Sequence, residues 1–472
     1  MNVVSNAILC DGWPSTDEYG GLRPRRTEGL HMRIAMIGGG YVGLVSGACF
    51  ADLGVEVAVV ETDQAKLATL REGRIPIYEP GLDRLVTENV AAGRLSFGGD
   101  LAAAVAGAEA VFIAVGTPTR RGDGHADVSY VNAAAEQVAH ALTGYAVVIT
   151  KSTVPVGTGR RIAEIMRAAR PDLEFDIASN PEFLREGSAI GDFMRPDRVV
   201  IGTDSERARE VLRRLYRPLY LIEAPILFTN LETAELTKYA ANAFLAMKVT
   251  FINEMADLCE KIGADVHDVA RGIGLDGRIG RKFLHPGPGF GGSCFPKDTL
   301  ALMRIAQDWG APSRLVEATV QVNDARKSSM AARVIQALGG SAHGKTIAVL
   351  GLTFKPETDD MRDAPSLPIV SRLAEEGAAI RAFDPVGMEH ARHMLPASVS
   401  FCSDAYDAAT GADALVVVTE WNDFRALAPE RLRSLMRGTV IMDLRNVFDP
   451  KAMIAAGFDY RAIGRPLVRA VE

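Results

Sequence analysis

The sequence predicts an α/β protein in three parts, with a helical domain between two domains of alternating strands and helices. Three observations lead to this fold class. Short apolar strands, beginning with residues 33–37 and 55–60, alternate with helical segments, which is typical of a parallel sheet covered by helices. Over residues 230–271, apolar side chains recur at helical spacing without strand-like alternation. From Thr346 the alternation of strands and helices begins again.

The first α/β domain is predicted to cover residues 32–225. Its apolar segments predict strands at residues 33–37, 55–60, 110–115, 146–150, 175–178 and 198–201. A helix of small residues is expected at 44–53, where Gly54 ends it. Residues 1–31 mix glycine, proline and charged side chains with no apolar period, so we expect them to form a disordered extension.

The helical domain is predicted over residues 226–335 and the second α/β domain over 336–472. The helical domain should contain one long helix at 230–271, a loop rich in glycine and proline at 285–292, and a further helical stretch from about 297 to 338. In the last domain, strands are expected at residues 346–351, 379–383, 414–419 and 439–444.

Composition and charge exclude several classes of protein. A chain of 472 residues that is 48% hydrophobic can bury a large core. Because 59 acidic residues outnumber 52 basic ones, and the basic residues form no long block, we expect no nucleic acid partner. The 5 cysteines lack metal-ligand spacing, which argues against a metal site and favours a reducing compartment. No apolar stretch reaches the roughly 18 residues of a membrane span, so we expect a cytoplasmic protein without membrane contact.

The run Gly38–Gly43 predicts a dinucleotide-binding turn. Gly38, Gly40 and Gly43 have the required spacing, follow a predicted strand and open a predicted helix. Such glycines allow a tight turn and close approach to a pyrophosphate, which the helix N-terminus attracts. Glu61 ends the next strand, 18 residues after Gly43, where its carboxylate can accept from ribose hydroxyls and repel a 2′-phosphate. The sequence therefore favours NAD over NADP.

A second phosphate-loop pattern, in residues 339–346, has the wrong context. Its residues match the spacing of an ATP-binding P-loop. That mechanism needs a strand before the loop and a helix after it, whereas here a predicted strand follows. We therefore predict that these residues do not bind ATP.

Cys294 is a candidate nucleophile. It lies after the glycine loop and before a predicted helix, whose N-terminus should lower the thiol pKa. Asp298 follows by four residues, so on a helix the two share a face and the carboxylate could orient the thiol or a water. The alternative is a small buried side chain, as expected for Cys49 among its apolar neighbours.

Two further segments pair polar groups at helical spacing. Lys238 and Asn242 lie on one ridge of an otherwise apolar helix, where they could bind an oxyanion or form a solvated stripe. Residues 180–186 predict a helix start, with Asn180 as the cap and two acidic side chains, at 182 and 186, on one face. Those carboxylates could act in chemistry or simply complement the helix dipole.

From Met32 to about Gly464, the chain resembles the UDP-glucose 6-dehydrogenase family, within the wider group of nucleotide-sugar dehydrogenases. The resemblance is carried by Gly38–Gly43, Val115–Thr119, Lys151–Pro155, Asn180–Glu186, Leu236–Asn242, Arg278–Leu284, Gly287–Asp298, Phe354–Lys355 and Asp359–Arg362. The loop around Cys294 is the most specific of these motifs. The 31-residue extension departs from the family pattern.

The resemblance implies two Rossmann-like domains joined by a helical dimerisation core, with NAD on the first domain and a UDP-sugar held mainly by the core and the last. The implied cofactor-binding residues are Gly38, Gly40, Tyr41, Val42, Gly43, Glu61, Lys66, Thr117, Thr153, Glu186 and Arg362. The implied substrate-binding residues are Glu182, Phe183, Leu184, Arg185, Glu186, Lys238, Asn242, Arg278, Phe283, Leu284, His285, Pro286, Gly287, Gly291, Lys355 and Arg445. Among them, Arg278 matches a position that can reach the neighbouring subunit's site.

The implied activity is a four-electron, NAD-dependent oxidation of UDP-glucose to UDP-glucuronate, for nucleotide-sugar and polysaccharide biosynthesis. The implied catalytic residues are Cys294, Lys238, Asn242, Asp298, Glu182 and Thr153. A thiol suits this chemistry because it can trap an aldehyde as a thiohemiacetal and carry it to a thioester. Oxidation of GDP-mannose or a UDP-N-acetyl-hexosamine, a two-electron hydroxyacid dehydrogenase and a non-catalytic sensor are the alternatives.

Overall fold

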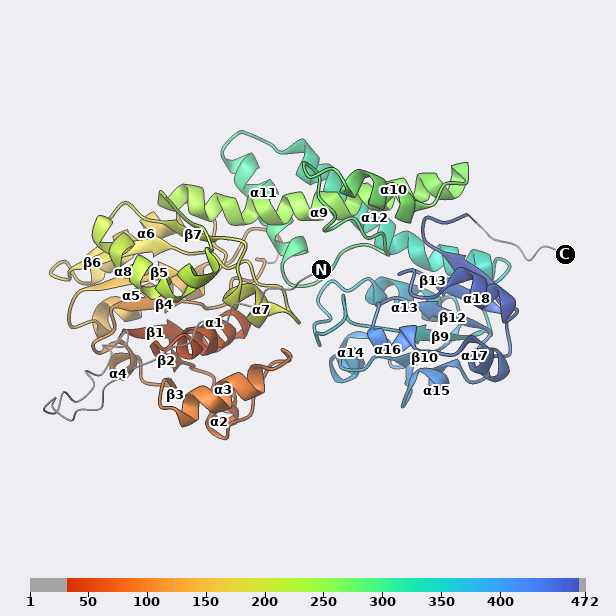
Figure 1. Cartoon of the computed structure of the whole chain (residues 1–472), viewed down its shortest axis with the longest axis horizontal. Coiled ribbons are helices and arrows are strands. Elements are labelled where there is room, and N and C mark those ends of the chain that lie inside the picture. The colour runs from red at the N-terminus through yellow and green to blue at the C-terminus, as the bar shows by residue number, and fades with distance from the viewer. Residues whose placement is uncertain (1–31, 121, 467–472) are drawn as a thin grey trace, which may run out of the picture.

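The computed structural model describes residues 32–120 and 122–466, and the extension predicted for residues 1–31 lies outside this part. Figure 1 shows two α/β domains at opposite ends of an elongated molecule, with long helices between them. This arrangement confirms the predicted fold class of two Rossmann-like parallel sheets and a central helical region.

The first sheet has eight strands in the order β3-β2-β1-β4-β5-β6-β7-β8. They are β1 (Arg33–Ile37), β2 (Glu56–Val60), β3 (Leu95–Gly98), β4 (Ala110–Ile113), β5 (Ala146–Thr150), β6 (Phe175–Ser179), β7 (Val199–Gly202) and β8 (Ile226–Thr229). All neighbours are parallel except β6 and β7. Because β8 pairs with β7, the sheet continues to Thr229, beyond the boundary predicted at residue 225.

Helices cover both faces of this sheet. They are α1 (Tyr41–Asp52), α2 (Gln64–Arg71), α3 (Leu82–Ala91), α4 (Leu101–Val105), α5 (Ser129–Ala141), α6 (Thr158–Ala169), α7 (Ala189–Met194) and α8 (Glu206–Leu215), with a 3-10 turn η1 (Arg217–Ile222). Alternate residues of β1 enter different cores, Ile34 and Met36 on one face and Ala35 and Ile37 on the other. This two-sided burial explains why the strand is continuously apolar.

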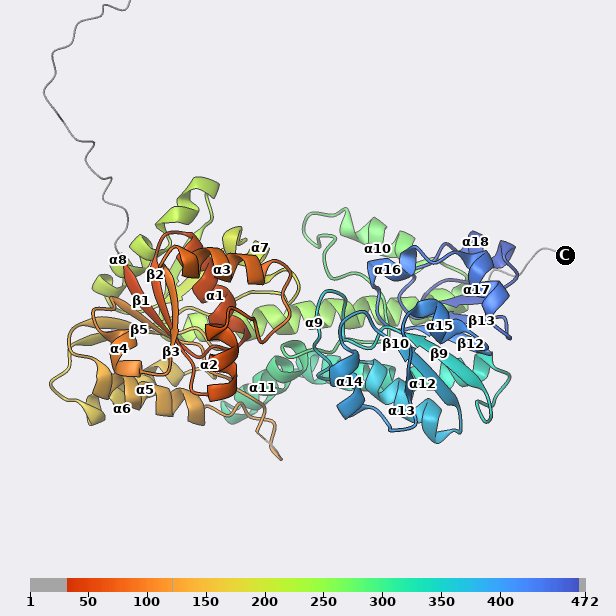
Figure 2. The ribbon, with the colours of Figure 1, turned by 90° about the horizontal axis from the view of Figure 1, so that it is seen from below.

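The central helices are α9 (Leu231–Ile262), α10 (Val266–Gly274), α11 (Phe295–Asp308) and α12 (Arg314–Ala337). Figure 2 shows α9 running from the first domain to the last. The single helix predicted for residues 230–271 is wrong in one respect, because Gly263 adopts a φ of 78° and ends α9. A second break, at Gly310 with a φ of 66°, separates α11 from α12.

The second sheet has six parallel strands in the order β11-β10-β9-β12-β13-β14. They are β9 (Thr346–Leu350), β10 (Ala379–Phe383), β11 (Ser400–Phe401), β12 (Ala414–Val417), β13 (Val440–Asp443) and β14 (Asp459–Ala462). Its helices are α13 (Ser366–Glu375), α14 (Met388–Met394), α15 (Ala405–Ala409), α16 (Asn422–Arg425), α17 (Pro429–Leu435) and α18 (Pro450–Ala455). Residues 339–346 lie after α12 and lead into β9, the reverse of the order in a P-loop.

The described residues contain neither a membrane-spanning helix nor a cluster of metal ligands. Within residues 32–120 and 122–466, no helix is both long and apolar enough to cross a membrane. The same residues contain no group of three or more histidine, cysteine or acidic side chains placed to hold a metal ion.

Candidate active site

The turn between β1 and α1 fits a dinucleotide pyrophosphate. Gly38 adopts a φ of 109°, and a Cβ on Gly43 would lie 1.9 Å from the carbonyl oxygen of Gly38. Gly40 precedes α1 without a side-chain cap, and a Cβ there would meet no atom within 4 Å. The N-terminus of α1 therefore combines open space with free backbone donors, as a bound phosphate requires.

The other predicted cofactor residues lie around this turn and along the carboxyl edge of the sheet. The buried Glu61 carboxylate at the end of β2 accepts from the backbone N–H of Gly39 at 3.2 Å, which places an acceptor beside the turn. Thr117 donates from its hydroxyl to the carbonyl oxygen of Thr153 at 2.9 Å, joining the loops after β4 and β5. Lys66 is exposed on α2. These positions fit NAD binding at the switch in strand order.

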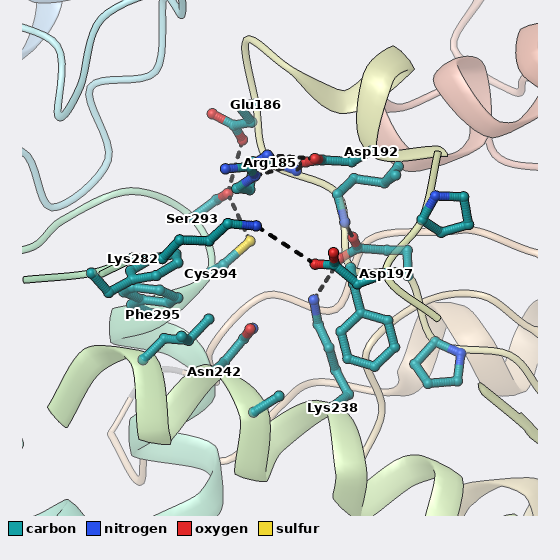
Figure 3. A pocket seen from close by; sticks show the side chains of 18 of the residues that line it. Arg185, Glu186, Asp192, Asp197, Lys238, Asn242, Lys282, Ser293, Cys294 and Phe295 are labelled. Atoms are coloured by element: carbon teal, nitrogen blue, oxygen red, sulfur yellow. Dashed lines mark hydrogen bonds and ion pairs between the residues drawn. The ribbon is translucent and has the colours of Figure 1, made fainter. Parts of the chain in front are cut away.

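A cavity of about 610 Å³ lies where the three parts of the chain meet. Figure 3 shows Lys238 and Asn242 rising from α9 toward it, with Cys294 on the facing loop. Of the predicted substrate and catalytic residues, the cavity wall contains Glu182, Phe183, Leu184, Arg185, Glu186, Lys238, Asn242, Phe283, His285, Gly291, Cys294, Lys355 and Arg445. The fold thus brings together residues more than 200 positions apart in the sequence.

Lys238 and Glu182 form a buried ion pair in the cavity wall. The Lys238 ammonium donates to Glu182 Oε1 at 3.0 Å, and the residues are 2% and 6% exposed. Burial opposes the charge on Lys238, but nearby anionic groups, Glu182 foremost, outweigh it and raise the pKa of the lysine. The pair therefore places the Lys238 ammonium next to a carboxylate in the cavity wall.

Asn242 and Asp298 form a second buried contact. The Asn242 amide donates to Asp298 Oδ2 at 2.6 Å, and Lys297 donates to Asp298 Oδ1, also at 2.6 Å. Asp298 is 1% exposed in the first turn of α11, so α9 and α11 are joined through these polar groups. The predicted i, i+4 ridge of Lys238 and Asn242 faces the site and is not a solvated stripe.

Cys294 immediately precedes α11, but its environment differs from the prediction in one respect. Burial raises the pKa of the thiol above its usual value, whereas the helix position predicted a lowered pKa. Lys238 and the Ser293 hydroxyl, 3.5 Å from the sulfur, both act to lower it. Desolvation of the thiol outweighs these two effects.

The predicted helix start at residues 180–186 is wrong, because this segment is a loop and α7 begins only at Ala189. The Asn180 side chain does not cap a helix. Its oxygen accepts from Lys151 at 3.0 Å and its nitrogen donates to the carbonyl oxygen of Val200 at 2.8 Å. These tertiary bonds hold the loop against β5 and β7, so its two acidic side chains do not share a helix face.

Glu186 joins the loop to the other two domains. It accepts from the hydroxyls of Ser293 at 2.9 Å and Thr358 at 3.1 Å, and from Arg362 at 3.4 Å. Burial raises the pKa of Glu186, and the nearby Asp360 adds to that shift. The predicted cofactor residues Glu186 and Arg362 therefore meet beside the Cys294 loop.

Several predicted residues lie outside the cavity wall. Arg278 is exposed, with its guanidinium paired to Asp276 at 2.6 Å. Leu284, Pro286 and Gly287 are buried, and a Cβ on Gly287 would lie 2.9 Å from the Arg445 guanidinium. None of these three residues lines the cavity in this chain.

The cavity also has polar lining residues that were not among the predicted site residues, including Lys151, Asp192, Asp197, Arg198, Tyr216, Lys282 and Glu420. The signal for Lys151 was its place directly after an apolar strand, where ligands bind to parallel sheets. Its ammonium is buried, and burial lowers its pKa to about 8. Lys282 lies within the motif Arg278–Leu284, and the others carried no sequence signal, because only the folded chain brings them to the cavity.

Comparison with known proteins identifies all three domains. The chain matches the UDP-glucose/GDP-mannose dehydrogenase family models for the NAD binding domain over residues 32–220, the central domain over 232–325 and the UDP binding domain over 348–450. The resemblance seen in the motifs is thus confirmed, and NAD is the cofactor of the first domain.

Similar proteins cover nearly the whole chain. A UDP-glucose 6-dehydrogenase of Rhizobium meliloti is 60% identical over 437 residues, which make up 92% of this chain and 100% of that protein. The UDP-glucose 6-dehydrogenase TuaD of Bacillus subtilis is 47% identical, with 93% of this chain and 95% of that protein covered. The solved UDP-glucose dehydrogenase of Pyrobaculum islandicum is 39% identical, with a TM-score of 0.85 over 94% of this chain and 100% of that one. The chain therefore belongs to the UDP-glucose/GDP-mannose dehydrogenase family and is an NAD-dependent oxidoreductase.

Proposed function

We propose that this enzyme oxidises the 6-hydroxymethyl group of UDP-glucose to a carboxylate, giving UDP-glucuronate, through a covalent intermediate on Cys294. The observation that carries the proposal is the placement of Cys294 in one cavity wall with Lys238 and Asn242. The names of the relatives that cover nearly the full chain support the choice of UDP-glucose.

NAD supplies the hydride acceptor for both oxidations. The turn at Gly38–Gly43 and the Glu61 carboxylate would hold it, on the geometry described above. In the first oxidation, the sugar hydroxyl loses a proton and its carbon loses a hydride. Lys238 and Asn242 would donate hydrogen bonds to the oxygen as it becomes a carbonyl, because both side chains project from one ridge of α9 into the cavity.

Cys294 would then add to the aldehyde carbon. The sulfur–carbon bond forms as the thiol loses its proton, giving a thiohemiacetal whose oxygen the same two donors stabilise. Loss of a second hydride from that carbon leaves a thioester on the cysteine sulfur. Burial raises the pKa of the Cys294 thiol, and the positive charge of Lys238 acts in the opposite direction. Lys238 would therefore help the sulfur to react as a thiolate.

Water would release the acid by attack on the thioester. Glu182 and Asp298 are the candidate bases or water-positioning groups, and each is hydrogen-bonded to one of the oxyanion donors. Thr153 lies outside the cavity wall, with its carbonyl held by Thr117, so a role for it would be indirect, through a bound water. The overall change consumes one water and two NAD per sugar.

We also propose that the enzyme works as a homodimer or higher homo-oligomer. Exposed apolar side chains follow one another along α9 at spacings of seven or four residues: Phe244, Phe251, Leu258 and Ile262 are 59%, 45%, 48% and 66% exposed. Such a stripe is large for a surface in contact only with water. Arg278 is exposed and does not line the chain's own cavity, as expected for a side chain that reaches the site of a neighbouring subunit.

A reducing, cytoplasmic setting is consistent with the thiols. Cys49, Cys259, Cys294 and Cys402 are all free, and a reactive Cys294 requires that it remain so.

Counting NADH per sugar tests the proposed function. The purified enzyme is given limiting UDP-glucose, UDP-galactose, UDP-N-acetylglucosamine or GDP-mannose with excess NAD, and both the initial rate and the final amount of NADH are measured by absorbance. We expect two NADH per UDP-glucose and much slower turnover of the others. One NADH per molecule would indicate a two-electron dehydrogenase, and a faster reaction with another sugar nucleotide would reassign the substrate.

A further inference from the structure

Glu79 is a buried carboxylate outside the cavity that the proposed chemistry does not use. It lies in the loop between α2 and α3 and is 7% exposed. Its Oε2 accepts from the Tyr41 hydroxyl and from the backbone N–H of Gly187 at 2.6 Å. Its Oε1 accepts from the backbone N–H of Ala189 at 2.8 Å. A buried carboxylate bound by three donors from two distant segments fixes those segments relative to each other.

The first of these segments is the dinucleotide turn. Tyr41 is the first residue of α1 and follows Gly40 directly. Burial and the hydrogen bond to Glu79 raise the pKa of Tyr41, so its hydroxyl stays protonated and donates. The position of the turn that would hold the pyrophosphate is therefore tied to Glu79.

The second segment is the loop that carries Glu182 and Glu186 into the cavity. Gly187 adopts a φ of 78°, and a Cβ there would lie 2.4 Å from the carbonyl oxygen of Glu357 in the last domain. The Ser188 side chain does not cap α7. Glu79 instead accepts a hydrogen bond from the backbone N–H of Ala189, the first residue of that helix. The loop is thus held between Glu79 on one side and the last domain on the other.

This loop also touches the reacting groups. Glu182 accepts from Lys238 at 3.0 Å, and Glu186 accepts from Ser293, the neighbour of Cys294, at 2.9 Å. Hydrogen bonds therefore connect the dinucleotide turn, through Glu79 and one short loop, to both sides of the cavity.

We propose that Glu79 is a positioning residue that couples the NAD site to the sugar-nucleotide site. The inference rests on the proposed function. A dinucleotide held at the turn fixes Tyr41, and Glu79 transmits that constraint to the loop bearing Glu182 and Glu186. Coupling of two binding equilibria is reciprocal, so a ligand in the cavity tightens NAD binding by the same factor.

Calorimetric titration of the full-length enzyme tests this coupling without turnover. NAD is titrated with and without saturating UDP-glucuronate, the proposed product, and the ratio of the two dissociation constants is the coupling factor. We expect tighter NAD binding with UDP-glucuronate in the parent, and Glu79→Gln to bring the ratio at least about threefold closer to one. Glutamine keeps the size of the side chain but replaces one acceptor oxygen by a donor, so at least one of the three bonds is lost.

Two further variants make the result specific. Tyr41→Phe removes only the hydroxyl that donates to Glu79, and combining it with Glu79→Gln should lower the coupling little further than either change alone. Glu88→Gln, on the exposed face of α3, is the matched control and should leave the coupling unchanged.

The possible outcomes separate the inference from the proposed function. A Glu79→Gln enzyme with a lowered Tm but the parent's coupling factor would overturn the positioning role, as would a parent without coupling. If Glu79→Gln does not fold, an unchanged coupling factor in Tyr41→Phe overturns it as well. A parent that binds NAD but not UDP-glucuronate would instead contradict the proposed function.

Discussion

Lys238 on α9 donates a hydrogen bond to Glu182 over 3.0 Å, and both side chains are almost fully shielded from solvent. Removing one member of a buried ion pair leaves the other charge uncompensated, which costs about 3–5 kcal/mol. We expect Lys238→Met to lower kcat by about 10²- to 10³-fold, through loss of an oxyanion donor. It should also lower the free energy of unfolding, measured by chemical denaturation.

The double variant Lys238→Met/Glu182→Gln separates these two effects. Removing both charges should restore much of the stability and none of the activity. Full activity in either variant would remove Lys238 from the proposed chemistry.

Glu61 should decide between NAD and NADP. Its carboxylate lies beside the dinucleotide turn, 3.2 Å from the Gly39 nitrogen, where a 2′-phosphate would meet like charge. We expect the parent to prefer NAD strongly. Glu61→Gln should lower the ratio of kcat/KM with NAD to kcat/KM with NADP by about tenfold, equivalent to 1.4 kcal/mol. Initial rates with both cofactors measure this, and equal rates in the parent would contradict the assignment.

The dinucleotide turn and the pairs on α9 and α11 could be predicted because their signals are local. The glycine spacing at Gly38–Gly43 has meaning only between a strand and a helix, and both flanking elements were readable from nearby residues. Lys238 and Asn242 share a ridge on any helix, so their common direction followed from spacing alone.

The features that could not be predicted from the sequence depend on tertiary contacts. Asn180 has the sequence of a helix cap, but its side chain bonds to Lys151 and Val200 instead, and no helix starts there. The pKa of Cys294 follows from how deeply the thiol is buried, which its position before α11 does not reveal. Lining residues such as Asp197 enter the cavity only through the packing of three domains.

The exposed stripe on α9 predicts an effect on assembly. Phe244 and Phe251 are one heptad apart, so they lie on the same face of the helix. We expect Phe244→Asp/Phe251→Asp to shift the protein toward monomer in sedimentation velocity at micromolar concentration. Tyr130→Asp, at a 60% exposed position on α5, is the control and should leave the parent's assembly unchanged. A parent that sediments as an active monomer would contradict the prediction.

Glu235 predicts a pH-dependent stability. This carboxylate, 2% exposed on α9, accepts from the backbone N–H groups of Gly157 and Gly159 at 2.7 Å each, at the start of α6. Burial raises its pKa from 4.5 to about 7. The native state thus keeps a proton that the unfolded state releases, and this group's contribution to stability is lost as the pH rises from about 4.5 through 7.

The variant Glu235→Gln isolates that contribution. Glutamine does not titrate, and its NH2 group cannot accept one of the two backbone N–H bonds, so the variant should be less stable than the parent near pH 5. Between pH 5 and a pH above 7, the free energy of unfolding of the variant should rise relative to that of the parent by an amount on the order of 3 kcal/mol. Unfolding in urea at several pH values measures the difference, and a difference independent of pH would show that Glu235 is not titrating in this range.

Cys294→Ser should abolish the four-electron reaction while leaving the binding of UDP-glucose and NAD nearly intact. The thiol lies in the cavity wall, but it acts covalently only after the aldehyde forms, and serine has too high a pKa to replace it at neutral pH. The control is Cys49→Ser. Cys49 is fully buried in α1, and burial raises its pKa to about 12, so this change should lower stability by burying a hydroxyl and spare the chemistry. The measurements are NADH formed per sugar and calorimetric binding of each ligand. If Cys294→Ser still formed two NADH per UDP-glucose at the parent's rate, the second oxidation would have to proceed through a free hydrate of the aldehyde.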